Sequence, residues 1–226
     1  MKTFGAVTIG QSPRPDITAD ILAVLGPDYR VVERGALDDL TRAEIDRLAP
    51  NPGEDVLVTR LRDGSEVQAA ERHITPLVQQ KVNELFAEGV PVVVLLCTGH
   101  FPGFTANGPV LRPQELINQG AADLGRGKKV GVLCPTPEHI PQMKRQWGQV
   151  LGSEPLVMAA SPYHGISAVE QPAFAMKEAG VQVVAMDCIA YSLALKERVE
   201  QITGARELLP RTLAAEAIRA YFDEIP

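Results

Sequence analysis

Two ten-residue segments, 88–97 and 179–188, align without a gap at a separation of 91 residues. They share one glycine, three valines and a final cysteine. Each segment follows a predicted helix and is apolar at nearly every position, which is typical of a strand buried on both faces of a parallel sheet. Any helix–glycine–strand unit gives a similar pattern, but the cysteines in register favour a duplicated unit. The chain is therefore predicted to contain two similar α/β halves.

The rest of the chain alternates short β-branched runs with amphipathic stretches, which indicates parallel α/β units. Strands are predicted at residues 4–9, 29–32, 90–96, 130–133, 156–159 and 181–186. Helices are predicted at residues 16–25, 75–88, 113–124, 192–202 and 213–222. Residues 56–69 differ, because Asp63-Gly64 lies between two alternating runs and predicts a hairpin. A loop rich in glycine and proline, 101–109, separates the two halves.

Three further helix starts are predicted from capping patterns. The segments 41–44 and 167–170 have the spacing of capping boxes. Thr136 precedes Pro137, which predicts an N-cap with proline at the first helical position. Pro141 fits poorly inside that helix, so a later start is left open.

Composition excludes several classes of function. The 226 residues include no apolar run of the roughly 20 residues that span a bilayer, and the N-terminus leads directly into a strand, so neither membrane nor export is expected. Three cysteines fit reduced thiols better than a disulfide framework, which predicts a cytoplasmic protein. The net charge of −6 without a basic cluster argues against nucleic acid. The four histidines show no paired metal spacing, so no metal is expected. His100 and His164 follow strands and could each donate to substrate, although solvated loop histidines are the preferred interpretation.

The register-matched cysteines, Cys97 and Cys188, stand just beyond the ends of two buried strands. Open parallel sheets bind ligands at these carboxyl ends, and two such sheets related by approximate two-fold symmetry can share one cleft. A thiol and a thiolate on opposite sides of a ligand can supply the acid and the base that invert a carbon next to a carboxylate, without a cofactor. Free cysteine is also a common buried hydrophobe, and this interpretation is preferred for Cys134.

Residues beside the two cysteines are candidates for binding a small carboxylate ligand. Backbone N–H groups and hydroxyls bind carboxylates, and arginine pairs with them. The candidates are Gln11, Ser12, Arg14, Thr98, Gly99, Thr136, Ile189 and Ala190. A surface arginine between two prolines is the alternative for Arg14, and a plain N-cap is the alternative for Thr136. Strand alternation predicts that Asp187 points away from Cys188.

Two features resemble known families. Leu96-Cys97-Thr98-Gly99 and Asp187-Cys188-Ile189-Ala190, spaced across the two halves, resemble the cysteine motifs of the aspartate/glutamate/hydantoin racemase superfamily. The opening segment 8–16, TIGQSPRPD, together with the hairpin segment 60–64, RLRDG, resembles the AroM family in particular. The AroM resemblance runs along essentially the whole chain.

The superfamily resemblance implies two pseudo-symmetric doubly wound lobes with mainly parallel sheets and a ligand cleft between them. It assigns residues 1–106 to the first lobe, to which 209–226 return, and 107–208 to the second. It also implies cofactor-independent proton transfer by the paired cysteines on small amino-acid-like acids, although related members isomerise maleate or decarboxylate malonates. The AroM resemblance implies no settled activity.

The chain departs from the superfamily pattern at both cysteines. Aspartate and glutamate racemases usually follow the first cysteine with Asn-Thr and the second with Thr-His. This chain has Thr98-Gly99 and Ile189-Ala190 at those places, so the second site lacks the usual hydroxyl and imidazole.

Three hypotheses of function follow. The first is an isomerase or racemase of a small carboxylic or amino acid that uses Cys97 and Cys188 as opposed acid and base. The second is a thiol-dependent lyase or hydrolase with Cys188 as nucleophile. The third is a non-catalytic protein that binds a small carboxylate or regulates in response to it. A homodimer is compatible with each of them.

Overall fold

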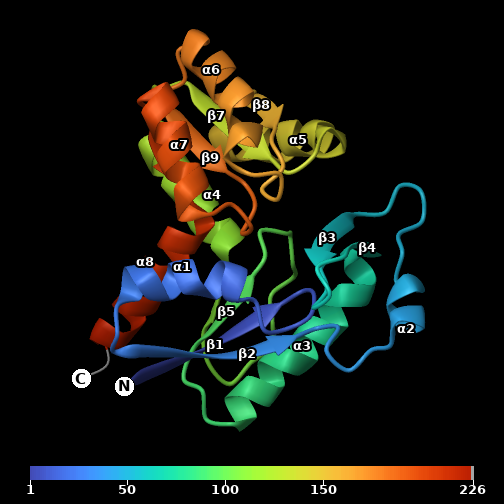
Figure 1. The fold of residues 1–226 in the computed structure, drawn as a ribbon. Helices are drawn as coiled ribbons and strands as arrows, with labels where there is room; N and C mark the ends of the chain where they lie inside the picture. Colours follow the sequence, from blue (N-terminus) through green and yellow to red (C-terminus); the bar gives the residue numbers. More distant parts are fainter. Residues whose placement is uncertain (225–226) are drawn as a thin grey trace. The chain divides into compact units, whose positions relative to one another are not determined.

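The computed structural model describes residues 1–224, which form two compact units. The first unit contains Met1–Arg112 and the chain from Ala215 onward, and the second contains Pro113–Ala214. Each unit is built around a four-stranded sheet with helices beside it (Figure 1). The prediction of an α/β fold with mainly parallel sheets is confirmed.

The sheet of the first unit has the strand order β2-β1-β5-β6, and all of its pairs are parallel. A separate antiparallel hairpin, β3–β4, follows α2. The elements of this unit are β1 (Lys2–Thr8), α1 (Pro15–Leu25), β2 (Tyr29–Gly35), α2 (Arg42–Asp46), β3 (Val56–Arg60), β4 (Glu66–Ala70), α3 (Glu71–Ala87), β5 (Val93–Leu96) and β6 (Val110–Leu111).

The second unit repeats the same arrangement of strands. Its sheet has the order β8-β7-β9-β10, and again all pairs are parallel. Its elements are α4 (Pro113–Leu124), β7 (Val130–Cys134), the 3₁₀ turn η1 (Pro137–His139), α5 (Ile140–Leu151), β8 (Leu156–Ala159), the 3₁₀ turn η2 (Ile166–Val169), α6 (Glu170–Glu178), β9 (Val183–Met186), α7 (Leu193–Thr203) and β10 (Arg206–Leu208). The last helix, α8 (Pro210–Glu224), begins in this unit and continues in the first.

The internal repeat extends to the packing of one glycine in each central strand. Gly5 pairs with Val93, and Gly131 pairs with Val184, so the two partners are 91 residues apart. A Cβ atom at either glycine would contact two residues. One lies on the helix before the neighbouring strand, and the other follows the glycine turn that ends this helix. The contacts are 2.9 Å to Leu85 and 3.2 Å to Val90 at Gly5, and 3.0 Å to Met176 and 3.1 Å to Val181 at Gly131. These neighbours also differ by 91 residues, so the two units share one packing scheme.

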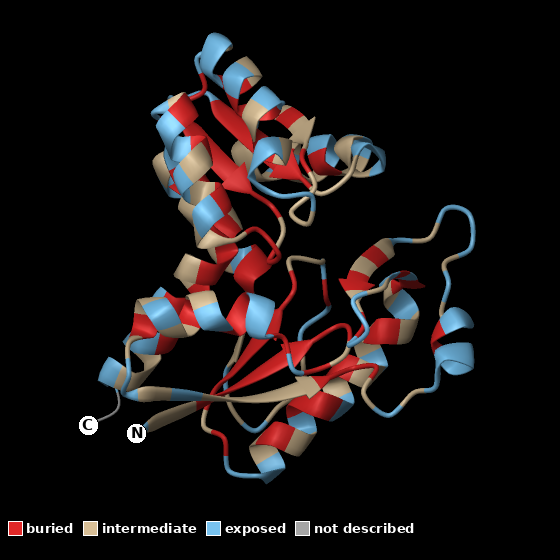
Figure 2. Ribbon diagram, in the orientation of Figure 1, coloured by how far each residue is buried: buried red, intermediate tan, exposed pale blue. Residues whose placement is uncertain are grey.

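The helix ends that precede β5 and β9 are equally matched. Gly89 has a φ of 83° and Gly180 a φ of 71°, a conformation that glycine adopts without strain. The N–H of Val90 donates to the Leu85 carbonyl at 3.1 Å, and the second unit repeats this bond between Val181 and Met176 at 3.0 Å. Each turn is followed by a strand, β5 or β9, whose residues are all buried (Figure 2).

Several predicted boundaries are wrong. The Ser167 capping box does not form, because residues 166–169 make a 3₁₀ turn and α6 begins at Glu170 without a side-chain cap. Thr136 precedes the 3₁₀ turn η1 and makes no side-chain capping hydrogen bond, whereas the later helix start that Pro141 left open is confirmed, since α5 begins at Ile140. The strands β6 and β10 have two and three residues, too few for a periodic pattern, and were not predicted. The capping box at Thr41 is confirmed, and so is the hairpin predicted at 56–69, whose strands are Val56–Arg60 and Glu66–Ala70.

Within residues 1–224, no helix combines the length and the apolar character that a bilayer crossing requires.

Candidate functional site

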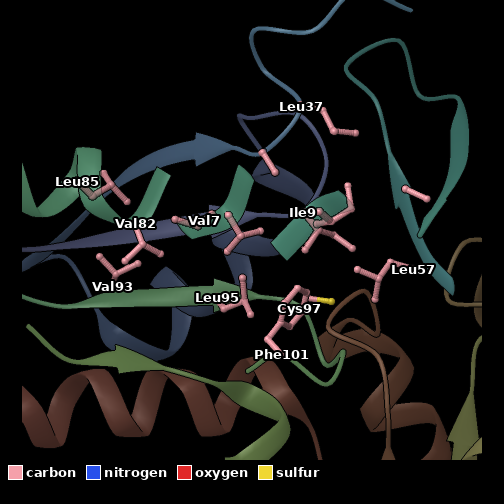
Figure 3. Close-up of a cluster of buried hydrophobic side chains, with 14 of the residues drawn as sticks. Val7, Ile9, Leu37, Leu57, Val82, Leu85, Val93, Leu95, Cys97 and Phe101 are labelled. Carbon is pink, nitrogen blue, oxygen red and sulfur yellow. The ribbon is translucent and has the colours of Figure 1, made fainter. Parts of the chain in front are cut away.

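The first cysteine lies at the end of β5 in the first unit. Cys97 follows Leu96 directly, is 8% exposed and packs in a cluster with Leu57 and Phe101 (Figure 3). The N–H of Gly99 donates to the Cys97 sulfur at 3.2 Å. A backbone N–H directed at sulfur stabilises a thiolate, so this loop can support an ionised Cys97.

Glycine at position 99 leaves room for the side chains that pack on this turn. A Cβ atom there would lie 2.8 Å from Leu57 and 3.0 Å from Phe101. Leu57 belongs to the hairpin strand β3, so the hairpin packs directly over the turn after Cys97. The small size of Gly99 therefore fits the close packing of the hairpin on this turn.

Asp38, a residue that the sequence analysis did not select, organises the neighbouring loop after β1. Its carboxylate accepts hydrogen bonds from the Ser12 N–H at 2.7 Å, the Ser12 hydroxyl at 2.6 Å and the Gly35 N–H at 2.6 Å. Arg62 of the hairpin adds a charged donor at 2.6 Å. The hydroxyl of Ser12, predicted to bind ligand, thus donates to Asp38 in this structure.

Arg62 also connects the hairpin to the loop itself. Its Nε donates to the Ser12 carbonyl at 2.6 Å, and its backbone N–H donates to the Gln11 side-chain oxygen at 3.0 Å. The Gln11 amide nitrogen donates in turn to the Leu37 carbonyl at 3.3 Å. Gly10 permits this approach, since a Cβ atom there would lie 2.6 Å from the Arg60 carbonyl oxygen. The two segments 8–16 and 60–64 are therefore one hydrogen-bonded structure.

Arg14 is buried, so the alternative of a surface arginine at this position is wrong. Its Nε and Nη2 donate to the two carboxylate oxygens of Asp16, both at 2.8 Å. Its backbone N–H donates to Glu33 at 2.6 Å. One edge of the guanidinium is thus occupied by a carboxylate of the same loop.

The second cysteine lies two residues beyond the end of β9, in the second unit. Cys188 is half-buried and packs against the cluster that contains Val184 and Met186. Asp187 faces the other side of the sheet, where its carboxylate accepts a hydrogen bond from the Trp147 indole at 2.7 Å. Asp187 therefore points away from Cys188, as strand alternation predicts.

Two buried side chains hold the turn that follows Cys188. Arg211, at the start of α8, donates to the Ile189 carbonyl at 2.6 Å and to the Ala190 carbonyl at 2.8 Å. Tyr191 donates from its hydroxyl to the Ala160 carbonyl at 2.6 Å, and its N–H closes the turn on the Cys188 carbonyl at 3.2 Å. The sequence analysis missed Arg211, because an arginine that binds backbone carbonyls leaves no side-chain partner in the sequence pattern.

Thr136 and Cys134 follow β7 in the same unit. The Thr136 hydroxyl lies 2.9 Å from His139 Nδ1, and burial lowers the pKa of this histidine. The Cys134 thiol is fully buried, and burial, followed by the charge of Asp187, raises its pKa to about 12. Cys134 is therefore a neutral core thiol at physiological pH.

The remaining candidates do not form a metal site. His100 and His164 are both exposed. Within residues 1–224, no group of three or more His, Cys, Asp or Glu side chains is placed to bind a metal ion.

The two units, each a parallel sheet of the same order with a cysteine after its third strand, define an α/β protein with the fold of the racemases and related isomerases. Allantoin racemase from Pseudomonas fluorescens is 16% identical, with a TM-score of 0.62 over 98% of this chain and 91% of that chain. Maleate isomerase from Pseudomonas putida S16 is 14% identical, with a TM-score of 0.64 over 98% and 94%. Aspartate racemase from Picrophilus torridus is 12% identical, with a TM-score of 0.61 over 98% and 94%. At these identities the similarity establishes the fold alone.

The family follows from the sequence. The family described as AroM protein matches residues 4–221. The chain therefore belongs to the AroM family, as the segments 8–16 and 60–64 predicted. No curated protein matches the chain.

Proposed function

We propose that this protein is a cofactor-independent isomerase or racemase that acts on a small carboxylic or amino acid. One of the two cysteines, as the thiolate, takes the proton from the carbon next to the carboxylate, and the electron pair stays on the substrate as an enolate-like anion. The other cysteine, as the thiol, returns a proton to the opposite face of that carbon. After one turnover the first cysteine is the thiol and the second is the thiolate, so the two cysteines together hold the same number of protons as before. In the reverse direction the two roles are exchanged.

One observation carries this proposal: Cys97 and Cys188 occupy equivalent places in two units of equivalent construction. Each cysteine follows the third strand of its sheet, and the two strands are preceded by matching helix ends and flanked by matching glycines. Parallel sheets bind ligands at this end of their strands. Two equivalent thiols are what a reaction with two-sided proton transfer requires.

The polar groups around each cysteine support the same proposal. The Gly99 N–H already contacts the Cys97 sulfur. After Cys188, the chain makes a tight turn whose carbonyls are bound by Arg211. Backbone N–H groups of such turns can bind a carboxylate and stabilise the negative charge that develops beside it. The proposed ligand site is lined by Gln11, Ser12, Thr98, Thr136, Ile189 and Ala190. The proposed reaction requires no metal or organic cofactor.

The test is incorporation of solvent deuterium at the α-carbon of a panel of small carboxylic and amino acids. The wild-type protein is expected to exchange the α-proton of at least one acid, detected by mass spectrometry or NMR. Cys97→Ala and Cys188→Ala are each expected to abolish interconversion of the two faces. Cys134→Ala is the matched control, since this thiol is buried and neutral, and it is expected to retain exchange. Interconversion of the two faces that persists in both of the first two variants would contradict the proposal.

A second function, non-catalytic binding of a small carboxylate, is favoured by a specific observation. Ser12 donates to Asp38 and Arg14 pairs with Asp16, so two side chains beside the first site are engaged within the protein. A protein of this kind shows a thermal shift with ligand, no deuterium exchange, and binding that survives both cysteine substitutions. A covalent adduct on Cys188 would instead indicate the lyase or hydrolase chemistry of a nucleophilic thiol.

A further inference from the structure

The residue that controls the turn after Cys188 lies on a different element, at the start of α8. Arg211 is 2% exposed, although arginine is rarely buried so completely. Its Nε donates to the Ile189 carbonyl and its Nη2 to the Ala190 carbonyl, at 2.6 and 2.8 Å. A planar guanidinium fork that binds two consecutive carbonyls fixes the orientation of both peptide groups.

The bond from Arg211 to the Ile189 carbonyl also determines the direction of the Ala190 N–H. The Ala190 N–H belongs to the same planar peptide as the Ile189 carbonyl and points in the opposite direction. It is therefore directed away from the guanidinium. The next N–H along, that of Tyr191, closes the turn by donating to the Cys188 carbonyl at 3.2 Å. Of the two peptides that Arg211 orients, the first therefore has its N–H on the side of the turn that lies away from the guanidinium.

We infer that Arg211 is a positioning residue for the ligand carboxylate: it holds the 188–191 turn so that the Ala190 N–H binds a carboxylate placed next to the Cys188 sulfur. The inference rests on the proposed function for its ligand class. It goes beyond that proposal in assigning the orientation of the turn to a side chain on α8, outside the turn itself. Tyr191 and Asp187 anchor the ends of the same turn through their bonds to Ala160 and Trp147. Arg211 alone of these side chains binds the two carbonyls in its middle.

The test compares two alkylating reagents at Cys188, followed by site-resolved mass spectrometry. Iodoacetate carries a carboxylate next to its reactive carbon, and iodoacetamide carries a neutral amide of nearly the same shape. The ratio of their rate constants therefore reports carboxylate recruitment, separately from the general reactivity of the thiol. In Arg211→Met this ratio is expected to fall at least fivefold from the wild-type value. Arg211→Lys keeps the charge but loses the fork, and its ratio is expected to fall at least threefold.

Arg219→Met is the matched control. Arg219 lies on the same helix, and its Nη2 donates to the Val24 carbonyl at 2.5 Å, in the first unit. It is expected to keep the wild-type ratio. If Arg211→Met unfolds, Arg211→Lys decides the question, together with its thermal unfolding temperature.

Each remaining outcome separates one claim from another. A lower unfolding temperature with an unchanged ratio in both Arg211 variants would mean that Arg211 is merely structural, and would overturn the inference. A wild-type ratio in Arg211→Lys would show that the positive charge alone recruits the carboxylate, without the two-pronged binding of the carbonyls. That result would also overturn the inference. A wild-type ratio no higher than that of a small free thiol would overturn it as well, since no carboxylate would then be recruited. The α-proton exchange experiment is independent of this ratio, so loss of exchange alone leaves the inference standing while the proposed reaction fails.

Discussion

Arg62 Nη2 donates to Asp38 Oδ1 at 2.6 Å, and this ion pair joins the hairpin β3–β4 to the loop that follows β1. Asp38 is the more buried partner, with a side chain that is 13% exposed against 49% for Arg62. The same carboxylate also accepts two hydrogen bonds from Ser12 and one from Gly35. Asp38 is therefore the acceptor that holds the loop after β1, which contains Ser12.

Removing that acceptor should cost considerable stability. In Asp38→Ala the two backbone N–H donors and the serine hydroxyl lose their partner, and unpaired polar groups of this kind cost about 1–3 kcal/mol each when they are shielded from water. We expect the free energy of unfolding to fall by about 2–4 kcal/mol, measured by urea denaturation. Asp39→Ala is the control, because Asp39 is exposed and its buried partner Lys81 keeps a second ion pair with Glu84, so a much smaller loss is expected. Equal losses in the two variants would contradict the role given to Asp38.

The matched glycines of the two central strands predict matched mutational costs. In Gly5→Ala and Gly131→Ala the new methyl group would lie 2.9 and 3.0 Å from buried side chains. Overpacking of this kind costs about 1–3 kcal/mol, and we expect both variants to lose stability within that range. Gly148→Ala is the control, since nothing lies within 4 Å of its Cβ position and it stands inside α5. It should gain about 0.5–1 kcal/mol, because alanine is the better helix former.

Cys134 and Cys188 should differ in their reactivity toward alkylating reagents. Burial raises the pKa of Cys134 to about 12, so its thiolate is scarce at pH 8. In the folded protein we expect iodoacetamide to modify Cys188 at pH 8 while Cys134 stays unmodified. Urea at denaturing concentration should make Cys134 react like any free thiol. Modification of Cys134 in the folded state at the rate of Cys188 would contradict its assignment to the core.

The sequence predicted the fold well because its elements obey local periodicity. The buried runs before Cys97 and Cys188, the hairpin at Asp63-Gly64 and the capping box at Thr41 all reflect constraints within about ten residues, and each prediction of these elements is confirmed. The Ser167 capping box is wrong although it has the right spacing. The chain there forms a 3₁₀ turn before the helix, so Ser167 never occupies the cap position.

The site could be predicted only in part, because its supporting residues act at long range. Asp38 is 26 residues from Ser12, and Arg211 is 22 residues from Ile189. Such contacts depend on which strand lies beside which, and this is fixed by the sheet order rather than by local sequence. The cysteines were found because the repeat placed them in register. The charge of Arg14 suggests a ligand partner, and only the conformation of the loop shows that the guanidinium pairs with Asp16.

Glu207 on β10 should make stability depend on pH. Burial, and then the charge of Glu200, raises the pKa of Glu207 to about 7, whereas a glutamate in the unfolded chain titrates near 4.3. Between these values the folded state binds the proton and the unfolded state does not, so the stability falls as the pH rises from about 4.5 to about 7. We expect a contribution of about 1–3 kcal/mol over this window, measured by urea denaturation from pH 4.5 to 8. Glu207→Gln should remove it, while Glu178→Gln, at an exposed position, should not.

The proposed reaction makes a geometric demand on Cys97 and Cys188 that a cross-linker can test. Each sulfur must approach the reacting carbon to about 3–3.5 Å from opposite faces, so the two sulfurs should come within roughly 6–8 Å of each other. A short bis-electrophile such as 1,3-dibromoacetone should therefore join the two cysteines within one chain, and a saturating substrate-like acid should slow the reaction. Peptide mapping would identify the linked pair, and Cys134 should be absent from it because its thiol is fully buried. If every reagent up to this length gives only monofunctional adducts on Cys97 and Cys188, the two thiols do not act on the same carbon.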